Sequence, residues 1–502
     1  MKKILYLSCF ALLLFCISCG TARVAFDPER KYAPETLQGD YRIFRNILEE
    51  SHPSLYWYTP QDSMNYYFDK GYAQLADSMT ESQFRTTLSY VISRVRCGHT
   101  AVRNSKQYEK YLDTARSPQF PLILKFWKDT MVVAANLNRK DSILKRGIVI
   151  QSINGRSAAQ LEDTLFNYII SDGYNLTGKY QYLSTGFHFS TWYKNVLGYP
   201  SSFNIKYLDS DNTVRQTTIP VYDPRTDTIK KYFNRAAHAE AEPHRKKRKA
   251  MERFYTRNLQ IDSTTNTAFM SLNTFEHGNH LVKFFHQSFQ TLDKRHIANL
   301  VIDVRSNGGG DATNSTLLTR YIIDKKFKVG DSLYAIRRHS KYDKYIEKSL
   351  LYRLLTVIVT SKHSDGKYHF GYFESHYYHP RRSHHFDGQV YILTGGNSFS
   401  ATSLFAGALK GQKNVTLVGE ETGGGYYGNT AWMIPDVTLP ATGVRFRLPR
   451  FRLVVDKTRE KNGRGISPDV PALPSPEAIG KGQDFKTAKV KELIMLHTVR
   501  QN

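Results

Sequence analysis

Cysteine is scarce in this sequence, which has only Cys9, Cys16, Cys19 and Cys97 among 502 residues. The first three lie in or directly after an apolar N-terminal segment, so a processed chain would keep only Cys97 in its folded part. An internal disulfide is therefore excluded, and the fold must be stabilised by its hydrophobic cores. A chain of this length, with 40% apolar residues, can bury several such cores, and its length predicts about three domains.

Apart from the apolar segment at the N terminus, the sequence has no apolar run long enough to cross a membrane. Residues 1–18 combine two N-terminal lysines with a short apolar stretch that ends at small residues, which predicts a signal peptide rather than a membrane span. Cys19 directly follows Ser18, as in bacterial lipoprotein signals, where the cysteine becomes the lipidated first residue. We therefore expect a lipid-anchored protein of the cell envelope, on its periplasmic or outer surface. A plain secretory signal is the alternative.

Acidic residues are few compared with basic ones, 45 against 70, which gives a formal net charge of +25. Such an excess favours an anionic partner, such as nucleic acid, anionic lipid, anionic glycan or an acidic peptide. No nucleic-acid-binding module is recognisable, so we expect no nucleic-acid partner. The dense basic run at 244–249 is expected to lie in a solvated linker, residues 223–258. A basic surface-binding lipoprotein would explain the charge but not the glycine-rich loops described next.

A polar turn joins a predicted buried strand, 390–393, to a predicted helix. In that helix Leu404, Phe405, Ala408 and Leu409 recur at helical spacing. A serine on such a turn stands clear of both elements, beside unpaired N–H groups and the positive end of the helix dipole. The turn therefore offers a candidate nucleophile. Capping of the helix N terminus is the alternative role for its hydroxyl groups.

A second predicted strand, 300–305, leads directly into Gly308, Gly309 and Gly310. Consecutive glycines are costly in chain entropy, so they indicate backbone with positive φ or close approach to another group. The N–H groups of such a loop can form an oxyanion hole.

Four segments together resemble one enzyme family. LVIDVRSNGGG, SFSATSLFAGALK, LVGEETGGG and GRGISPDV occur in the order found in the C-terminal processing and tricorn-type serine peptidases. The resemblance implies a ββα-spiral catalytic core related to the crotonase fold, peptide or protein substrates, and no cofactor. Matched to the family's Ser-Ala-Ser motif, Ser400 is the nucleophile and the Ala401 N–H is one oxyanion donor. Gly308 or Gly309 supplies the second donor, and Ser398 is the alternative nucleophile.

A histidine is the expected base. The pattern Thr80-Glu81-Ser82-Gln83 predicts a capping box at the start of a helix, which should end with Gly98 as a left-handed C′ residue. The following segment, Cys97 to Thr100, resembles the histidine motif of the tricorn-like branch. We therefore expect His99 to take the proton from Ser400.

The lysine of the Ser-Lys branch of the family is missing. That lysine follows in the loop after the next strand, where this chain has residues 423–426, GGGY. Lys410 and Lys413 lie on the wrong side of that strand. A Ser-Lys pair is therefore not expected.

The sequence offers several candidates for the residue that orients the histidine. The resemblance places an acidic residue shortly before GRGISPDV, where the chain offers Glu460, with Asn462 nearer the expected register. Glu420 and Glu421 are alternatives because they are close to the serine in sequence. Thr100 is a candidate for a hydroxyl that relays between the carboxylate and the histidine.

We expect a multidomain α/β protein. The predicted order is signal peptide 1–18, helical domain 24–116, PDZ-like domain 117–222, linker 223–258, and an α/β peptidase domain, 259–480, with an insertion at 327–386. The insertion is rich in histidine but lacks ordered acidic or cysteine ligands, so we expect no metal site there. It is a candidate lid over the active-site cleft.

The sequence thus predicts a serine endopeptidase that acts on peptides or proteins in the cell envelope. An acyl-enzyme would form on Ser400, with His99 as general base. The alternative is a catalytically silent protein of the same fold that binds peptides or apolar ligands.

Overall fold

The computed structural model describes residues 26–227 and 245–501. The predicted signal peptide, the predicted lipidation site Cys19 and residues 228–244 of the predicted linker lie outside these ranges. Within them, no helix is both long and apolar enough to cross a bilayer.

The N-terminal region is mainly helical, as predicted. It contains β1 (Lys31–Tyr32), α2 (Pro34–Ser51), α3 (Gln61–Ala73), η1 (Gln74–Ala76), β2 (Met79–Thr80), α4 (Glu81–Val95), β3 (Val102–Arg103) and α5 (Lys106–Thr114). The predicted capping box of Thr80 and Gln83 is present at the start of α4. Apolar faces of the helices form one core.

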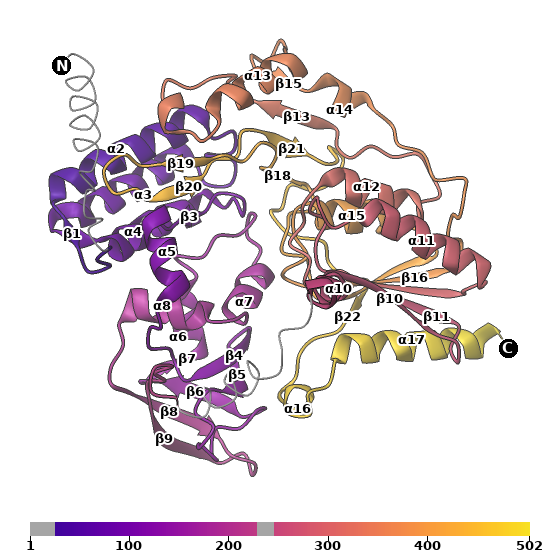
Figure 1. Cartoon of the computed structure of the whole chain (residues 1–502), viewed down its shortest axis with the longest axis horizontal. Helices are drawn as coiled ribbons and strands as arrows, with labels where there is room; N and C mark the ends of the chain where they lie inside the picture. The colour runs from indigo at the N-terminus through magenta and orange to yellow at the C-terminus, as the bar shows by residue number, and fades with distance from the viewer. Residues whose placement is uncertain (1–25, 228–244, 502) are drawn as a thin grey trace, which may run out of the picture.

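A hairpin from the far end of the chain completes that core. It consists of β19 (Asp436–Thr438) and β20 (Arg445–Arg447), and β20 pairs with β3. Phe446 of β20 packs edge-on against Phe44 of α2, with ring centroids 5.2 Å apart. Figure 1 shows this yellow hairpin among the indigo helices. The helical region is therefore held to the C-terminal region by shared core packing.

The middle region is built on an antiparallel sheet with the order β4-β5-β6-β8-β9. Its elements are β4 (Leu122–Trp127), β5 (Thr130–Asn136), β6 (Val149–Ile153), β7 (Arg156–Ser157), α6 (Ala158–Leu165), α7 (Thr177–Leu183), α8 (His188–Leu197), β8 (Ser202–Leu208) and β9 (Val214–Pro220). The hairpin predicted around residues 209–212 is confirmed as β8 and β9.

The C-terminal region has the alternating α/β order that was predicted. It comprises α10 (Arg245–Thr256), β10 (Arg257–Asp262), β11 (Thr267–Leu272), α11 (Leu281–Lys294), β12 (Asn299–Asp303), α12 (Ala312–Arg320), β16 (Gln389–Thr394), α15 (Ala401–Leu409), β17 (Val415–Gly419), β22 (Val470–Pro471), α16 (Pro476–Gly480) and α17 (Phe485–Gln501). The sheet order is β10-β11-β12-β16-β17-β22. All pairs from β11 to β22 are parallel, whereas the β10 edge is antiparallel.

This sheet is covered on both faces. Buried side chains of α11, α12 and α15 pack on one face, and those of α17 pack on the other. Strands buried on both faces read as continuous apolar runs, which explains why β12 and β16 were recognisable in the sequence.

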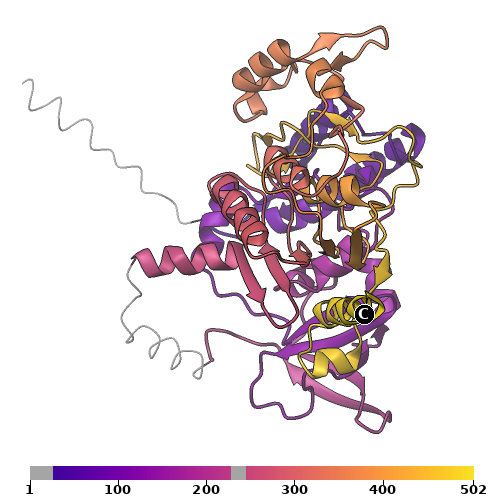
Figure 2. The same ribbon diagram turned by 90° about the vertical axis from the view of Figure 1, so that its right-hand side faces the viewer.

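The insertion contributes to a second small sheet with the order β14-β15-β13-β21-β18. Its strands and helices are β13 (Ser332–Ala335), η2 (Asp343–Tyr345), α13 (Ser349–Val359), β14 (Ser361–Lys362), β15 (Tyr368–His369) and α14 (Gly371–Ser375), and the partner strands are β18 (Gly428–Asn429) and β21 (Arg452–Val454). Figure 2 shows the orange insertion at the top edge of the molecule, away from the yellow C-terminal helix.

Candidate active site

The predicted glycine loop and serine turn leave the sheet side by side. β12 and β16 are adjacent and parallel, with Asp303 opposite Leu393 at their carboxyl ends. The loop after β12 and the turn after β16 therefore emerge at the same edge of the sheet, which is where open α/β sheets bind ligands. The Phe399 N–H donates to the Asn307 carbonyl (3.2 Å), which fastens the two segments together.

Ser400 has a backbone conformation that is unusual for a residue with a side chain. Its φ is 56° and its ψ is −122°, directly before the first residue of α15. Such strain is typical of a nucleophile on a sharp strand-to-helix turn. The Ser400 hydroxyl makes no capping bond to α15. Instead, Ser400 Oγ lies 3.0 Å from His99 Nε2, so the side chain faces a base.

Ser398, the alternative nucleophile, has a structural role. It is fully buried, its Oγ donates to the Val304 carbonyl (2.8 Å), and it accepts from the Gly395 N–H (3.2 Å). These bonds tie the serine turn to the end of β12, so its hydroxyl is engaged within the scaffold.

His99 reaches the serine from the N-terminal region. The prediction that α4 ends with Gly98 in the left-handed conformation is wrong, because α4 ends at Val95 and Arg96 has that conformation (φ 55°, ψ 42°). The Arg96 guanidinium lies over the ring of Tyr174, 4.2 Å from its centroid. A glycine at position 98 is explained by close packing instead, because a Cβ there would lie 2.5 Å from the ring of Phe399.

The His99 imidazole is buried against the serine turn. Its ring centroid lies 4.6 Å from that of Phe399, and only 6% of the residue is exposed. Burial lowers the pKa of His99, the Asp172 carboxylate opposes this by raising it, and Arg447 lowers it further. The ring is thus held neutral near pH 7, the form that can accept a proton. Among the described residues, His99 Nδ1 has no hydrogen-bond partner.

Asp172 is the acidic residue that the structure places beside His99, and the sequence analysis did not single it out. It is buried, between α6 and α7 in the chain, and accepts hydrogen bonds from the Gly98 N–H (2.7 Å) and the Gly425 N–H (3.2 Å). Cys97, His99 and Asp172 bring ligand-capable atoms within 4.8 Å of one another. Asp172 therefore holds the histidine loop and the loop after β17 in place and adds a negative charge near the imidazole.

The residues predicted to orient His99 lie elsewhere. Glu460 is exposed, and its carboxylate accepts from Asn462 Nδ2 (3.2 Å). Glu420 pairs with Lys486 (2.6 Å). The structure therefore does not bring Glu460 or Glu420 to the histidine.

Two further candidates are also engaged elsewhere. Glu421 pairs with Arg464 (2.6 Å), and Thr100 Oγ1 lies 2.7 Å from His52 Nε2. Neither makes a hydrogen bond to His99 in the described part of the chain.

The structure bears on three candidate donors for an oxyanion hole, the N–H groups of Ala401, Gly308 and Gly309. Ala401 is the first residue of α15, where the N–H has no partner within the helix. Gly309, with φ 102°, packs so closely that a Cβ there would lie 2.7 Å from Ser400 Cβ. The Gly309 N–H, however, donates to Asn307 Oδ1 (2.9 Å). No bond from the Gly308 N–H is recorded among the described residues, which favours Gly308 as the second donor.

In the described part of the chain, the side-chain partner of Ser400 Oγ is His99, and no lysine hydrogen-bonds to it. Lys410 pairs with Asp469 (2.6 Å). Lys486, which the sequence analysis did not consider, is buried near the turn, but its recorded partners are the Thr394 carbonyl (2.9 Å) and the carboxylate of Glu420 (2.6 Å).

The group of Cys97, His99 and Asp172 is the one set of potential metal ligands found in the described residues. Burial raises the pKa of the Cys97 thiol to about 11, so the thiol is protonated at neutral pH. A metal ion binds the thiolate form. The described insertion histidines form no such group, and the predicted absence of a metal stays a prediction.

Cavities flank the serine on two sides. One, of about 710 Å³, is lined by Ser400, Ala401, Tyr352 and Trp432 among others. The other, of about 480 Å³, is lined by Gly308 and Phe399 of the site and by apolar side chains from the first two regions. The apolar side chains are Ile92, Val102, Tyr168, Ile169, Ile170, Tyr182 and Trp192.

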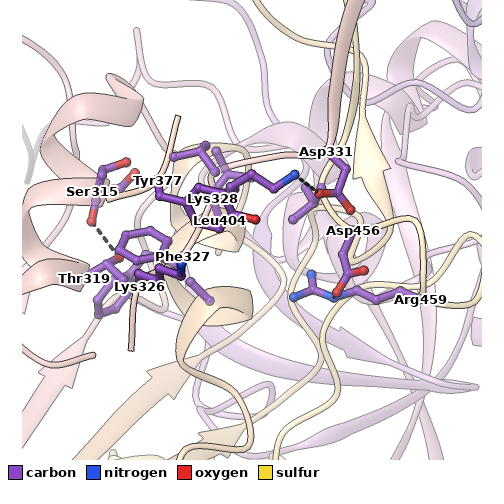
Figure 3. Close-up of a pocket in the computed structure, with 15 residues that line it drawn as sticks. Ser315, Thr319, Lys326, Phe327, Lys328, Asp331, Tyr377, Leu404, Asp456 and Arg459 are labelled. Atoms are coloured by element: carbon purple, nitrogen blue, oxygen red, sulfur yellow. Dashed lines mark hydrogen bonds and ion pairs between the residues drawn. The ribbon is translucent and has the colours of Figure 1, made fainter. Parts of the chain in front are cut away.

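A third cavity, of about 330 Å³, contains neither Ser400 nor His99. Figure 3 shows its charged side chains turned toward one another, with Lys328 paired to Asp331 (2.7 Å). Arg459 likewise pairs with Asp456 (3.3 Å). These two ion pairs include four of the five charged side chains that line the cavity, and the fifth, Lys326, lies over the ring of Tyr377, 5.0 Å from its centroid.

Comparison with known proteins identifies the catalytic region. Residues 266–472 match the model of peptidase family S41, a range that includes Ser400 and the glycine loop. Residues 266–472 are an S41 peptidase domain. The protein is accordingly a serine-type peptidase, a hydrolase. His99 and Asp172 lie outside the matched range, so their roles are argued from geometry.

A fold likeness to solved structures extends over almost the whole chain. Mature CPAF aligns with a TM-score of 0.60 and 13% identity, over 92% of this chain and 97% of that one. Mature CPAF complexed with lactacystin aligns with the same TM-score and identity, over 93% and 98%. At this identity the likeness concerns the fold alone. No curated protein sequence matches the chain.

Proposed function

We propose that this protein is a serine endopeptidase in which Ser400 forms an acyl-enzyme and His99 is the general base. The observation that carries the proposal is the 3.0 Å contact between Ser400 Oγ and His99 Nε2, across the strained turn before α15. A hydroxyl is a weak nucleophile on its own and is activated by an adjacent base.

In the proposed reaction, Ser400 Oγ attacks the scissile carbonyl while His99 Nε2 takes the hydroxyl proton. The Ala401 and Gly308 N–H groups stabilise the oxyanion as it develops. His99 then gives its proton to the leaving amine. In the second half of the reaction His99 takes a proton from water, which attacks the acyl carbonyl, and then returns the proton to Ser400 Oγ as the ester bond breaks. The Asp172 carboxylate stabilises the transient imidazolium through space.

The middle region is proposed to serve the same site. Its antiparallel sheet, with the capped helix α6, supports the predicted PDZ-like domain, which would take an extended peptide as an added strand. Asp172 and part of the wall of the 480 Å³ cavity come from this region, so peptide held there would lie close to Ser400. The parallel sheet of the catalytic region likewise supports the proposed ββα-spiral core.

We propose that the protein works in the cell envelope, lipid-anchored at Cys19. The support is the signal-like composition of residues 1–18 and the cysteine that follows them. Replacing Cys19 with Ala should release the protein from the membrane fraction or block its processing. Unchanged fractionation would contradict the anchor.

A fluorophosphonate probe tests for an activated serine. Wild-type protein should be labelled covalently, Ser400→Ala should not be labelled, and Lys410→Ala should be labelled like wild type because it leaves the pair intact. Lactacystin, present in the CPAF complex, offers a second probe that should compete with the label. No labelling of folded wild type, under conditions that label a control peptidase, would favour the catalytically silent alternative.

A further inference from the structure

Helix α13, in the insertion, exposes its apolar side to solvent. Six large apolar side chains of this 11-residue helix are exposed, and Leu350 (78%) and Ile358 (69%) are the most exposed large hydrophobic residues in the described chain. The six are Leu350, Leu351, Leu354, Leu355, Val357 and Ile358. At the helical period they form one continuous arc of about 160°.

The polar side of α13 faces the protein instead. Thr356 is buried, with its Oγ1 3.6 Å from Met433 Sδ, and Tyr352 lines the 710 Å³ cavity that contains Ser400. A helix that packs on a water-soluble surface normally buries its apolar face. The reverse arrangement indicates that a second apolar environment covers the outer face of α13.

The charge around α13 indicates which environment fits. Residues 337–362 contain seven Lys and Arg against two acidic residues, a net charge of +5 (7 − 2). Apolar side chains next to Lys and Arg are the composition of helices that lie in the interface of an anionic bilayer. A second copy of the chain would bring a patch of the same sign against this one, which disfavours self-association.

The location of α13 suits a flat surface. In Figures 1 and 2 the helix lies at the outer edge of the insertion, at the top of the molecule and far from α17. We propose that the exposed face of α13 docks on an anionic lipid bilayer, with its apolar side chains among the acyl chains and its basic neighbours at the headgroups. Because Tyr352 belongs to the same helix, the 710 Å³ cavity would then lie next to the membrane surface.

Vesicle co-sedimentation tests the docking. The chain from residue 19 onward, with Cys19→Ser to prevent lipid attachment, should sediment with phosphatidylglycerol–phosphatidylcholine vesicles and less with pure phosphatidylcholine vesicles. Leu354→Glu combined with Ile358→Glu should weaken binding by about tenfold or more, because the two glutamates add negative charge and remove apolar area. Circular dichroism and Tm should stay unchanged, since both side chains are exposed.

Two matched variants locate the effect. Met495→Glu with Leu496→Glu on α17, and Met251→Glu with Phe254→Glu on α10, alter pairs of similarly exposed apolar residues, and both should bind vesicles like wild type. Absence of wild-type binding, equal binding by the α13 variant, or loss of binding only in the α10 variant would overturn the proposal.

Two other occupants of the face would give different results. A wild-type dimer that the α13 variant converts to a monomer in light scattering would mean that the face joins two copies. A higher KM for unfolded β-casein in the α13 variant, without vesicles and without a change on a short peptide, would mean that the face binds substrate. Either result without vesicle binding overturns the lipid assignment.

Discussion

At the scale of single residues, the base of the proposed reaction is a buried imidazole whose pKa is lowered mainly by loss of water. His99 accepts a proton only when neutral, so kcat/KM on a peptide should rise with pH through one ionisation below the ordinary histidine value of about 6.5. The rate should then stay level through neutral pH. A rate–pH series in wild type checks this, and a rate that keeps climbing in alkaline solution would indicate a lysine base.

Removal of His99 is the complementary change. His99→Ala should lower kcat by several orders of magnitude, because losing the base of such a unit costs nearly as much as losing the nucleophile. Lys486→Met serves as the comparison, since Lys486 contacts the turn but not Ser400. Near-normal turnover in folded His99→Ala would show that another group takes the proton.

Substitution of Asp172 should change the kinetics, whereas substitution of Glu460 should not. Asp172 raises the pKa of His99, so Asp172→Asn should move the acid limb of kcat/KM to still lower pH. It should also reduce kcat by about tenfold, roughly 1.4 kcal/mol of transition-state stabilisation. Glu460→Gln should leave both unchanged, because Glu460 is exposed and bonds to Asn462. A large loss in Glu460→Gln, with little effect of Asp172→Asn, would restore the role assigned from the family resemblance.

At the scale of elements, two neighbouring residues of the glycine loop should respond differently to substitution by alanine. Gly309 has positive φ and lies against Ser400, so Gly309→Ala should lower Tm clearly and abolish labelling of the serine. A Cβ at Gly308 would meet no atom within 4 Å, and alanine keeps the N–H. Gly308→Ala should therefore fold with a nearly unchanged Tm. Equal losses of Tm in both variants would contradict this account of the loop.

Some elements could be predicted from local sequence and others could not. β12, β16 and α4 were predictable because buried parallel strands read as apolar runs and the α4 capping box has a fixed spacing. The pairing of β3 with β20 was not, because it joins residues more than 340 positions apart and leaves no local periodicity. For the same reason the sequence indicated Ser400 and His99 but not Asp172, whose partners lie in other regions.

At the scale of the whole molecule, buried neutral histidines make stability depend on pH. Burial lowers the pKa of His52 to about 3 and lowers that of His99 as well. Unfolded histidines take up protons below about pH 6.5, whereas in the folded state these two take up protons only at lower pH. Their contribution to the free energy of unfolding should therefore be constant above about pH 6.5 and fall as the pH decreases below it.

Thermal unfolding between pH 5 and 8 checks this dependence. His52→Gln should lower Tm at neutral pH and flatten its decline on the acid side, because one of the two groups no longer titrates. The exposed His363→Gln is the control and should reproduce the wild-type curve. A wild-type Tm that does not fall below pH 6 would contradict the assignment.

The distance along the chain between His99 and Ser400 has a consequence for timing. The two residues are 301 positions apart, and the hairpin that completes the helical core follows the serine. A partly synthesised chain therefore has a histidine but no aligned nucleophile. Proteolytic competence would begin only when almost the whole polypeptide has been made and has folded, which protects the synthesis machinery from cleavage.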